Sequence, residues 1–165
     1  MGLSQEEIDR QEPIMAALFK AIREAETTEA GFEAAMAVMT PEAKTALGMT
    51  PEMDGALVVR QVSGPWFQYF LRYDPVPNWS RVKVPLLAIN GSLDLQVPAE
   101  ANLAAIRAAT AGNPDVTIVE LPGLNHLFQH ATTGSVGEYR DIEETFDPAA
   151  LALISDWISE RFVKP

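Results

Sequence analysis

Two ionisable side chains follow two predicted strands, one after each. Asp94 comes shortly after the apolar run Leu86–Ile89, and His126 follows the run Val116–Leu121. Because function in open α/β sheets gathers beyond the carboxyl ends of the strands, we expect both side chains at one edge of a parallel sheet. A carboxylate that fixes the tautomer of a neighbouring general-base histidine is the supporting half of an acyl-transfer triad.

Each of these residues also has an ordinary structural interpretation. An aspartate near glycine most often hydrogen-bonds local backbone in a turn, which would account for Asp94. A single histidine such as His126 is more often a hydrogen-bonded structural residue than a base. Their positions after consecutive strands favour the catalytic interpretation. We expect His130, which lies in a polar stretch, on the surface, and the sequence indicates no partner for it.

The back half of the chain predicts alternating strands and helices. A helix is expected from about Pro98 to near Gly112, between the two strands, and another begins at Asp147-Pro148. The order strand, helix, strand, helix predicts right-handed crossovers and a parallel sheet. Two strands are too few to complete such a sheet. The last helix carries an apolar stripe that we expect to face the core: Leu151, Ile154, Ile158 and Phe162.

The first third predicts short helices separated by proline and glycine. Ser4–Glu7 has the form of a capping box. Pro13 is expected to begin or kink a helix, and Thr40-Pro41 and Thr50-Pro51 are each expected to start one. An apolar stripe at helical spacing comprises Ile14, Leu18 and Ile22, with Met15 and Phe19 beside them.

Short motifs run in order through the second part of the chain: Pro65-Trp66-Phe67, Tyr73-Asp74-Pro75, Val84 to Gly91, Asp94 to Pro98, Leu121 to His126, and Glu143 to Phe146. Together they resemble the C-terminal portion of an α/β-hydrolase, of the bacterial esterase- and lipase-like serine hydrolases related to dienelactone hydrolases and acyl-peptidase catalytic domains. The resemblance covers about residues 62–163. Matched position by position, Asp94 takes the place of the family's triad acid and His126 that of its base, in the family's chain order.

The resemblance implies a fold class and a division of the chain. The fold would be α/β: a partial α/β-hydrolase fold with a short parallel sheet, flanking helices and an N-terminal helical lid. Residues 1–61 would form the helical lid or cap, and residues 62–165 the C-terminal part of the hydrolase core.

The nucleophile motif of that family is absent from these 165 residues. The family's serine stands in Gly-x-Ser-x-Gly at a sharp strand-to-helix turn. None of Ser63, Ser92 and Ser135 follows a strand in such a turn, although a complete small enzyme using Ser63 or Ser92 stays an alternative. We therefore expect a fragment of a serine hydrolase of the carboxylic ester or acyl type, which supplies the acid and base and is inactive alone.

A second interpretation belongs to another class of function. The chain would be a non-catalytic module derived from a hydrolase that self-associates or binds a ligand, with Asp94 and His126 as relics. A half-sheet must cover an exposed strand edge and apolar faces. We expect a homo-oligomer, in the form of a symmetric dimer, or pairing with the missing N-terminal half.

An aromatic cluster at Trp66, Phe67, Tyr69, Phe70 and Tyr73 lies in the stretch that is not acidic. Packing between lid and core is favoured over substrate contact, but Trp66 and Phe67 are retained as candidate residues for binding a small acyl or ester molecule.

Composition excludes several other classes of function. Twelve basic against 23 acidic residues give a net charge of −11, which argues against nucleic-acid partners and anionic membranes. No stretch approaches the roughly 20 apolar residues of a membrane span. The absence of cysteine excludes disulfides and thiolate metal sites, and we expect no metal and no cofactor. The acidic first residues are unlike a secretory signal, so a cytoplasmic location is expected.

Overall fold

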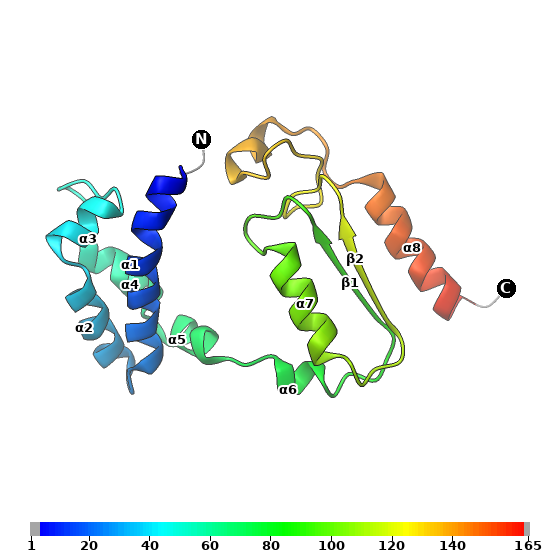
Figure 1. Cartoon of the computed structure of the whole chain (residues 1–165), viewed down its shortest axis with the longest axis horizontal. Helices are drawn as coiled ribbons and strands as arrows, with labels where there is room; N and C mark the ends of the chain where they lie inside the picture. Colours follow the sequence, from blue (N-terminus) through cyan, green and yellow to red (C-terminus); the bar gives the residue numbers. More distant parts are fainter. Residues whose placement is uncertain (1–3, 164–165) are drawn as a thin grey trace. The chain divides into compact units, whose positions relative to one another are not determined.

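The computed structural model describes residues 4–163, which divide into two compact units between Asp74 and Pro75 (Figure 1). The described chain is mixed α/β and mostly helical. The helical unit contains α1 (Gln5–Glu24), α2 (Thr28–Val38), α3 (Pro41–Ala46), α4 (Gly55–Val62) and α5 (Pro65–Arg72). The strand-containing unit comprises α6 (Val76–Trp79), β1 (Leu86–Gly91), α7 (Ala99–Ala109), β2 (Val116–Leu121), the 3₁₀ helix η1 (Val136–Asp141) and α8 (Pro148–Phe162).

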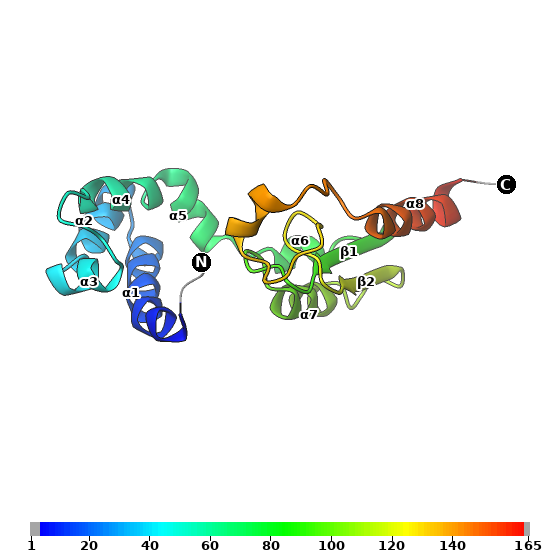
Figure 2. The ribbon, with the colours of Figure 1, turned by 90° about the horizontal axis from the view of Figure 1, so that it is seen from above.

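The core of the helical unit lies between α1, α2 and α4 (Figure 2). Leu18 and Ile22 of the predicted α1 stripe are buried, and they cluster with Ala35, Met39 and Val59. The stripe forms because residues four apart lie on one face of a helix. The capping box predicted at Ser4 is confirmed, since the Ser4 hydroxyl accepts from the Glu7 N–H and the Glu7 carboxylate accepts from the Ser4 N–H.

The helix start predicted at Thr50 is wrong, and of the two alternatives predicted for Pro13, beginning or kinking a helix, the first does not occur. Pro13 does not begin a helix, because α1 runs through it from Gln5 to Glu24 and its buried stripe outweighs one missing backbone donor. The segment after Thr50 forms a turn, and α4 begins only at Gly55 because Asp54 is the N-cap, accepting from the Ala56 N–H at 2.9 Å. The start at Thr40 is confirmed by the hydrogen bond from the Ala43 N–H to the Thr40 hydroxyl.

Helix α5 belongs to the helical unit because its polar side chains satisfy the end of α1. The buried Gln68 amide donates to the carbonyls of Ile22 at 3.1 Å and Ala25 at 3.0 Å. The Arg72 guanidinium donates to the Arg23 carbonyl at 2.7 Å and also to that of Ala25. These are carbonyls that the end of a helix leaves without partners. Residues 62–74, which the resemblance groups with the hydrolase core, thus pack with the preceding helices.

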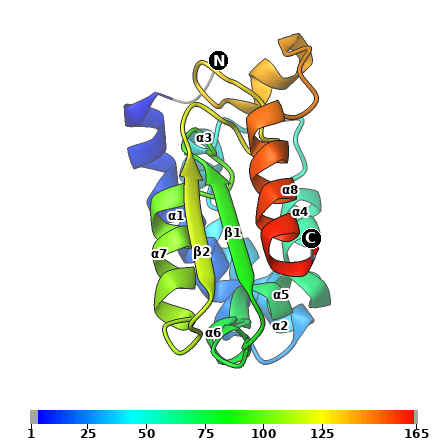
Figure 3. The ribbon, with the colours of Figure 1, turned by 90° about the vertical axis from the view of Figure 1, so that its right-hand side faces the viewer.

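The two strands pair in parallel with the register Leu86↔Val116 through Gly91↔Leu121. Helix α7 connects them and packs against both, and Figures 1 and 3 show α7 and α8 on opposite sides of the strands. The predicted order of strand, helix, strand and helix is therefore confirmed. Across the described residues the sheet consists of these two strands alone.

The prediction that the α8 stripe faces a core is wrong for three of its four residues. Leu151, Ile158 and Phe162 are exposed, and Ile154 is partly buried. Polar contacts hold α8 to the sheet instead: the Trp157 indole donates to the Thr117 hydroxyl at 2.9 Å, and Arg161 pairs with Asp115 at 3.0 Å. A sheet two strands wide offers too little surface to cover the stripe.

No helix in the described part of the chain is long and apolar enough to cross a bilayer.

We expect Ile22→Ala to lower the free energy of unfolding of the helical unit by about 2–5 kcal/mol, because it leaves a cavity in a tightly packed core. Amide hydrogen exchange should accelerate in residues 4–74 and stay unchanged in residues 75–163. Ile8→Ala is the matched control, since Ile8 lies exposed on the same helix. Equal acceleration in both units would contradict the division of the chain into two compact units.

Candidate functional site

The structure brings Asp94 and His126 into contact. The register of the sheet ends both strands side by side, so that the loops after β1 and β2 meet. Asp94 Oδ2 lies 2.9 Å from His126 Nδ1. The Asp94 residue is only 7% exposed, whereas the His126 side chain is 38% exposed. A buried carboxylate therefore holds one nitrogen of a ring that solvent still reaches.

The carboxylate of Asp94 is surrounded by hydrogen-bond donors. Its Oδ1 accepts from the N–H groups of Gln96 at 3.0 Å and Val97 at 2.8 Å. Its Oδ2 accepts from the Asn90 amide at 3.1 Å as well as facing His126. The local turn bonds expected of an aspartate near glycine are thus present together with the histidine contact.

These contacts set the charge of Asp94. Burial raises the pKa of the carboxyl, but the hydrogen bonds from the Val97 N–H, His126 and the Gln96 N–H outweigh it, so that the pKa lies below its ordinary value. An ionised carboxylate can only accept hydrogen bonds, so a neutral His126 ring donates its Nδ1–H to Asp94. That tautomer leaves the lone pair on Nε2, where a general base needs it.

The two loops approach so closely that a glycine is required between them. A Cβ built on Gly91 would lie 2.2 Å from the Leu124 carbonyl oxygen, far inside van der Waals contact. The Leu93 N–H donates to that same oxygen at 2.9 Å. The Ser92 hydroxyl accepts from the Gly123 N–H at 2.8 Å. Backbone contacts therefore set the spacing between the loop after β1, which carries Asp94 and is called the acid loop, and the loop after β2, which carries His126 and is called the base loop.

Two of the three candidate serines accept hydrogen bonds from backbone N–H groups, and the third is buried in the helical unit. Ser63 is buried at the end of α4 in the helical unit. Ser92 accepts the bond from Gly123 just described, and Ser135 accepts from the Gly137 N–H at the start of η1. Ser92 does follow β1 directly, in a turn, but α7 begins only at Ala99, so this serine does not stand at a sharp strand-to-helix turn. Neither Ser63 nor Ser135 directly follows a strand.

Trp66 and Phe67 lie on α5 in the helical unit. Trp66 is 72% exposed and stacks on Phe70 with ring centroids 5.5 Å apart. Phe67 is partly buried and packs against Phe19 of α1, with ring centroids 5.6 Å apart. Phe67 therefore has a packing role within its own unit, and the proposed role in binding an acyl molecule stays a prediction for both residues.

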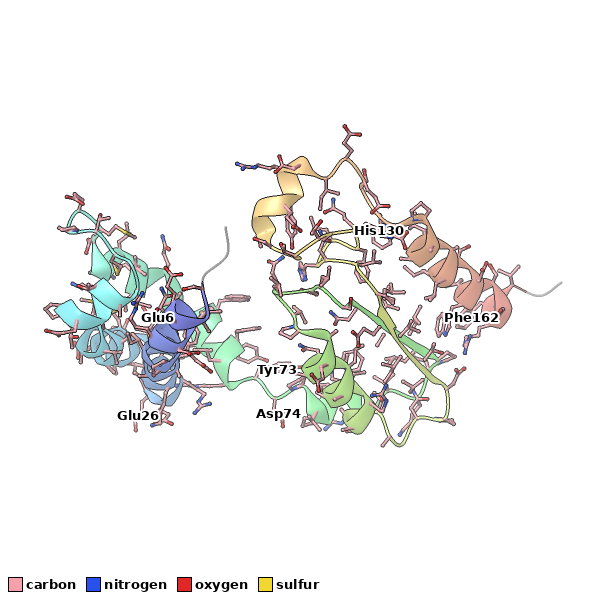
Figure 4. All side chains as sticks on the ribbon, turned by 45° about the horizontal axis from the view of Figure 1, so that its top comes forward. Glu6, Glu26, Tyr73, Asp74, His130 and Phe162 are labelled. Carbon is pink, nitrogen blue, oxygen red and sulfur yellow. The ribbon has the colours of Figure 1, made fainter. Side chains whose placement is uncertain are left out.

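His130 is exposed, as predicted, but it does have partners. Its Nδ1 lies 3.1 Å from a carboxylate oxygen of Glu144 and 3.9 Å from one of Asp147, beside the beginning of α8 (Figure 4). Among the described residues, these three place ligand atoms within 4.8 Å of one another, as a metal site would require. The carboxylates already accept from backbone: Glu144 from the His130 N–H, and Asp147 from the first turn of α8. Hydrogen bonding between His130 and Glu144 and capping of α8 by Asp147 therefore account for the contacts of this cluster.

No family model, curated protein or solved structure matches this chain.

We expect Gly91→Ala to separate the acid and base loops, because its methyl group would overlap the Leu124 carbonyl. The Asp94–His126 contact should be lost in a crystal structure, and the free energy of unfolding should fall by about 1–3 kcal/mol. Gly112→Ala is the matched control in the same unit, since a Cβ there meets only the end of the Lys83 side chain at 3.5 Å. An unchanged 2.9 Å contact in Gly91→Ala would contradict this account.

We also expect Asp94 to make stability depend on pH in acid. A carboxyl whose pKa is lowered by folding stabilises the protein above its unfolded pKa, and this contribution is lost as the pH falls through the lower, folded value. From about pH 4 downward, the free energy of unfolding in urea should fall more steeply in wild type than in Asp94→Asn. The exposed Asp156→Asn should follow wild type. Parallel curves for wild type and Asp94→Asn would show that the carboxylate is not stabilised by its donors.

Proposed function

We propose that this chain supplies the acid and the base of a serine hydrolase of the α/β-hydrolase type, acting on a carboxylic ester or a similar acyl bond. The observation that carries the proposal is the 2.9 Å contact between the buried Asp94 carboxylate and the half-exposed His126 ring. The order of the two residues and their places after consecutive parallel strands agree with that family. The fold would then be the C-terminal part of an α/β-hydrolase with a helical lid before it.

In the proposed reaction, His126 Nε2 takes the proton from a serine hydroxyl as that oxygen attacks the acyl carbon. Asp94 keeps the ring in the Nδ1–H tautomer and stabilises the imidazolium that forms. The leaving alcohol then receives the proton from Nε2. The same nitrogen then takes a proton from a water molecule as the water attacks the acyl-enzyme. The serine oxygen leaves with the proton from Nε2, which frees the acid product and returns His126 to its neutral form.

The serine and the donors of the oxyanion hole would come from outside these 165 residues. Gly-x-Ser-x-Gly does not occur in the sequence, and the three candidate serines have the local positions described above. A segment of the same protein or a separate polypeptide could supply the serine. We propose that this partner adds strands to the two-stranded sheet and covers apolar groups that the described residues leave exposed.

The alternative, a self-associating module, is favoured by one apolar groove. It lies between β1 and α8, has a volume of about 460 Å³, and is lined by Pro85, Leu86, Leu87, Ile89, Ile154, Trp157 and Ile158. A second copy of the chain could fill it and form a dimer. Light scattering of the purified chain at low micromolar concentration separates the cases: a dimer supports the module, and a monomer supports a protein that awaits a different partner.

We expect the chain alone to be inert toward p-nitrophenyl acetate and to gain esterase activity when co-expressed with the reading frame, adjacent in its gene or operon, that encodes Gly-x-Ser-x-Gly. Within that complex, His126→Ala and Asp94→Asn should each lower kcat by about 10³-fold or more. His130→Gln is the matched control and should leave kcat unchanged, because His130 pairs with Glu144 instead.

Two results would overturn the hydrolase proposal. One is full activity of the complex in His126→Ala. The other is flanking DNA without any such serine motif, together with a purified chain that is a stable dimer.

A further inference from the structure

The loop that carries His126 is closed by one buried residue pair. Asn125 is fully buried, and its Oδ1 accepts from the N–H groups of Leu127 at 2.9 Å and Gln129 at 3.0 Å. The Asn125 amide donates to Gln129 Oε1 at 3.0 Å, and the Asn125 N–H donates to the Gln129 carbonyl at 3.0 Å. Four hydrogen bonds therefore hold residues 125–129 in a tight loop, with His126 on it.

The loop is attached to the segment that precedes α8 through the same glutamine. Gln129 Nε2 donates to the Glu144 carbonyl at 2.7 Å. The next residue, His130, donates its N–H to the Glu144 carboxylate at 2.7 Å. Two hydrogen bonds thus attach the loop that carries His126 to Glu144.

The backbone conformation of Phe128 depends on contacts with the same segment, 144–147. It has a φ of +56°, in the left-handed region that a bulky side chain rarely adopts. Its carbonyl accepts from the Asp147 N–H at 2.7 Å, and its ring stacks on Phe146 at 5.2 Å. Contacts with segment 144–147 therefore offset a backbone conformation that is unfavourable by itself.

We propose that Gln129 is a positioning residue for His126: its side chain links the Asn125 turn to the Glu144 carbonyl and so holds the imidazole Nδ1 against Asp94. The inference rests on the proposed function, in which His126 is the base, but its geometry is independent of any nucleophile. The hydrogen bonds of Gln129 go to Asn125 and Glu144, so it would act on the ring through the backbone of the loop. Its amide is suited to the task because one end accepts from Asn125 while the other donates to Glu144.

The substitution Gln129→Glu tests the link with little change in shape. A carboxylate can still accept from Asn125 but has no donor for the Glu144 carbonyl, and two acceptors 2.7 Å apart repel each other. Gln96→Glu is the matched control: Gln96 lies in the acid loop, and its side chain is exposed and bonds only outward to the Tyr139 hydroxyl. Gln68→Glu in the helical unit controls for the cost of placing a carboxylate in a buried site.

The measurement is ¹⁵N NMR of the imidazole nitrogens in the whole chain, whose two histidines give a simple spectrum that His130→Gln assigns. It is recorded at about pH 9, where imidazoles are neutral. In wild type, His126 should be predominantly the Nδ1–H tautomer. Gln129→Glu should shift the tautomer ratio about five-fold toward Nε2–H, the effect of losing one net hydrogen bond. Gln96→Glu and Gln68→Glu should leave the ratio unchanged, although Gln68→Glu lowers the thermal midpoint.

An unchanged ratio in folded Gln129→Glu would overturn the proposal. Should that variant fail to fold, Gln129→Met, which has a similar length and no charge, carries the same expectation. Esterase assays of the co-expressed complex keep the two proposals apart. Activity that depends on His126 but not on Gln129 would overturn the positioning role alone, whereas a shifted tautomer in a complex without any activity would overturn the hydrolase function alone.

Discussion

The carboxylate of Asp94 is the group around which the strand-containing unit is organised. Burying a charge is unfavourable unless donors replace the water that it loses. Here the replacement comes from two backbone N–H groups, the Asn90 amide and the His126 ring. Three of these donors belong to β1 or the loop that follows it, and the fourth arrives from the loop after β2. The parallel register is therefore what allows the carboxylate to be both buried and ionised.

The elements that local sequence controls could be predicted. β1 and β2 follow from short apolar runs, and α8 follows from Asp147 at its N-cap and a proline in its first turn. The contact between Asp94 and His126 could be anticipated because parallel strands end at the same edge. Pro13 and Thr50 misled because α1 gains enough from packing to tolerate a proline, and because Asp54 competes for the cap of α4.

The hydrogen bonds that hold Asp94 and His126 in place could not be predicted in the same way. Nothing in the spacing of Asn90, Asn125 and Gln129 says which backbone groups their amides reach, since these depend on how loops far apart in the sequence are brought together. Gly91 is the last residue of β1 and pairs with Leu121. That it admits the Leu124 carbonyl is a property of the folded loops alone. The sequence indicates no partner for His130 for the same reason, because Glu144 lies 14 residues further along the chain.

Asp94 and His126 differ in charge and in exposure, and this difference bears on whether they form a working site or a relic. A turn after β1 needs an acceptor for the N–H groups of Gln96 and Val97, and a neutral asparagine would supply one without burying a charge. Asp94 instead carries a charge, and the group that gains from it is His126, whose ring it orients and whose protonated form it would stabilise. The His126 side chain remains 38% exposed to solvent. Proton transfer requires a carboxylate whose oxygens already have hydrogen-bond donors, next to a histidine that a third group can reach. A module used only for association gains nothing from this arrangement, and this favours the hydrolase proposal over its alternative.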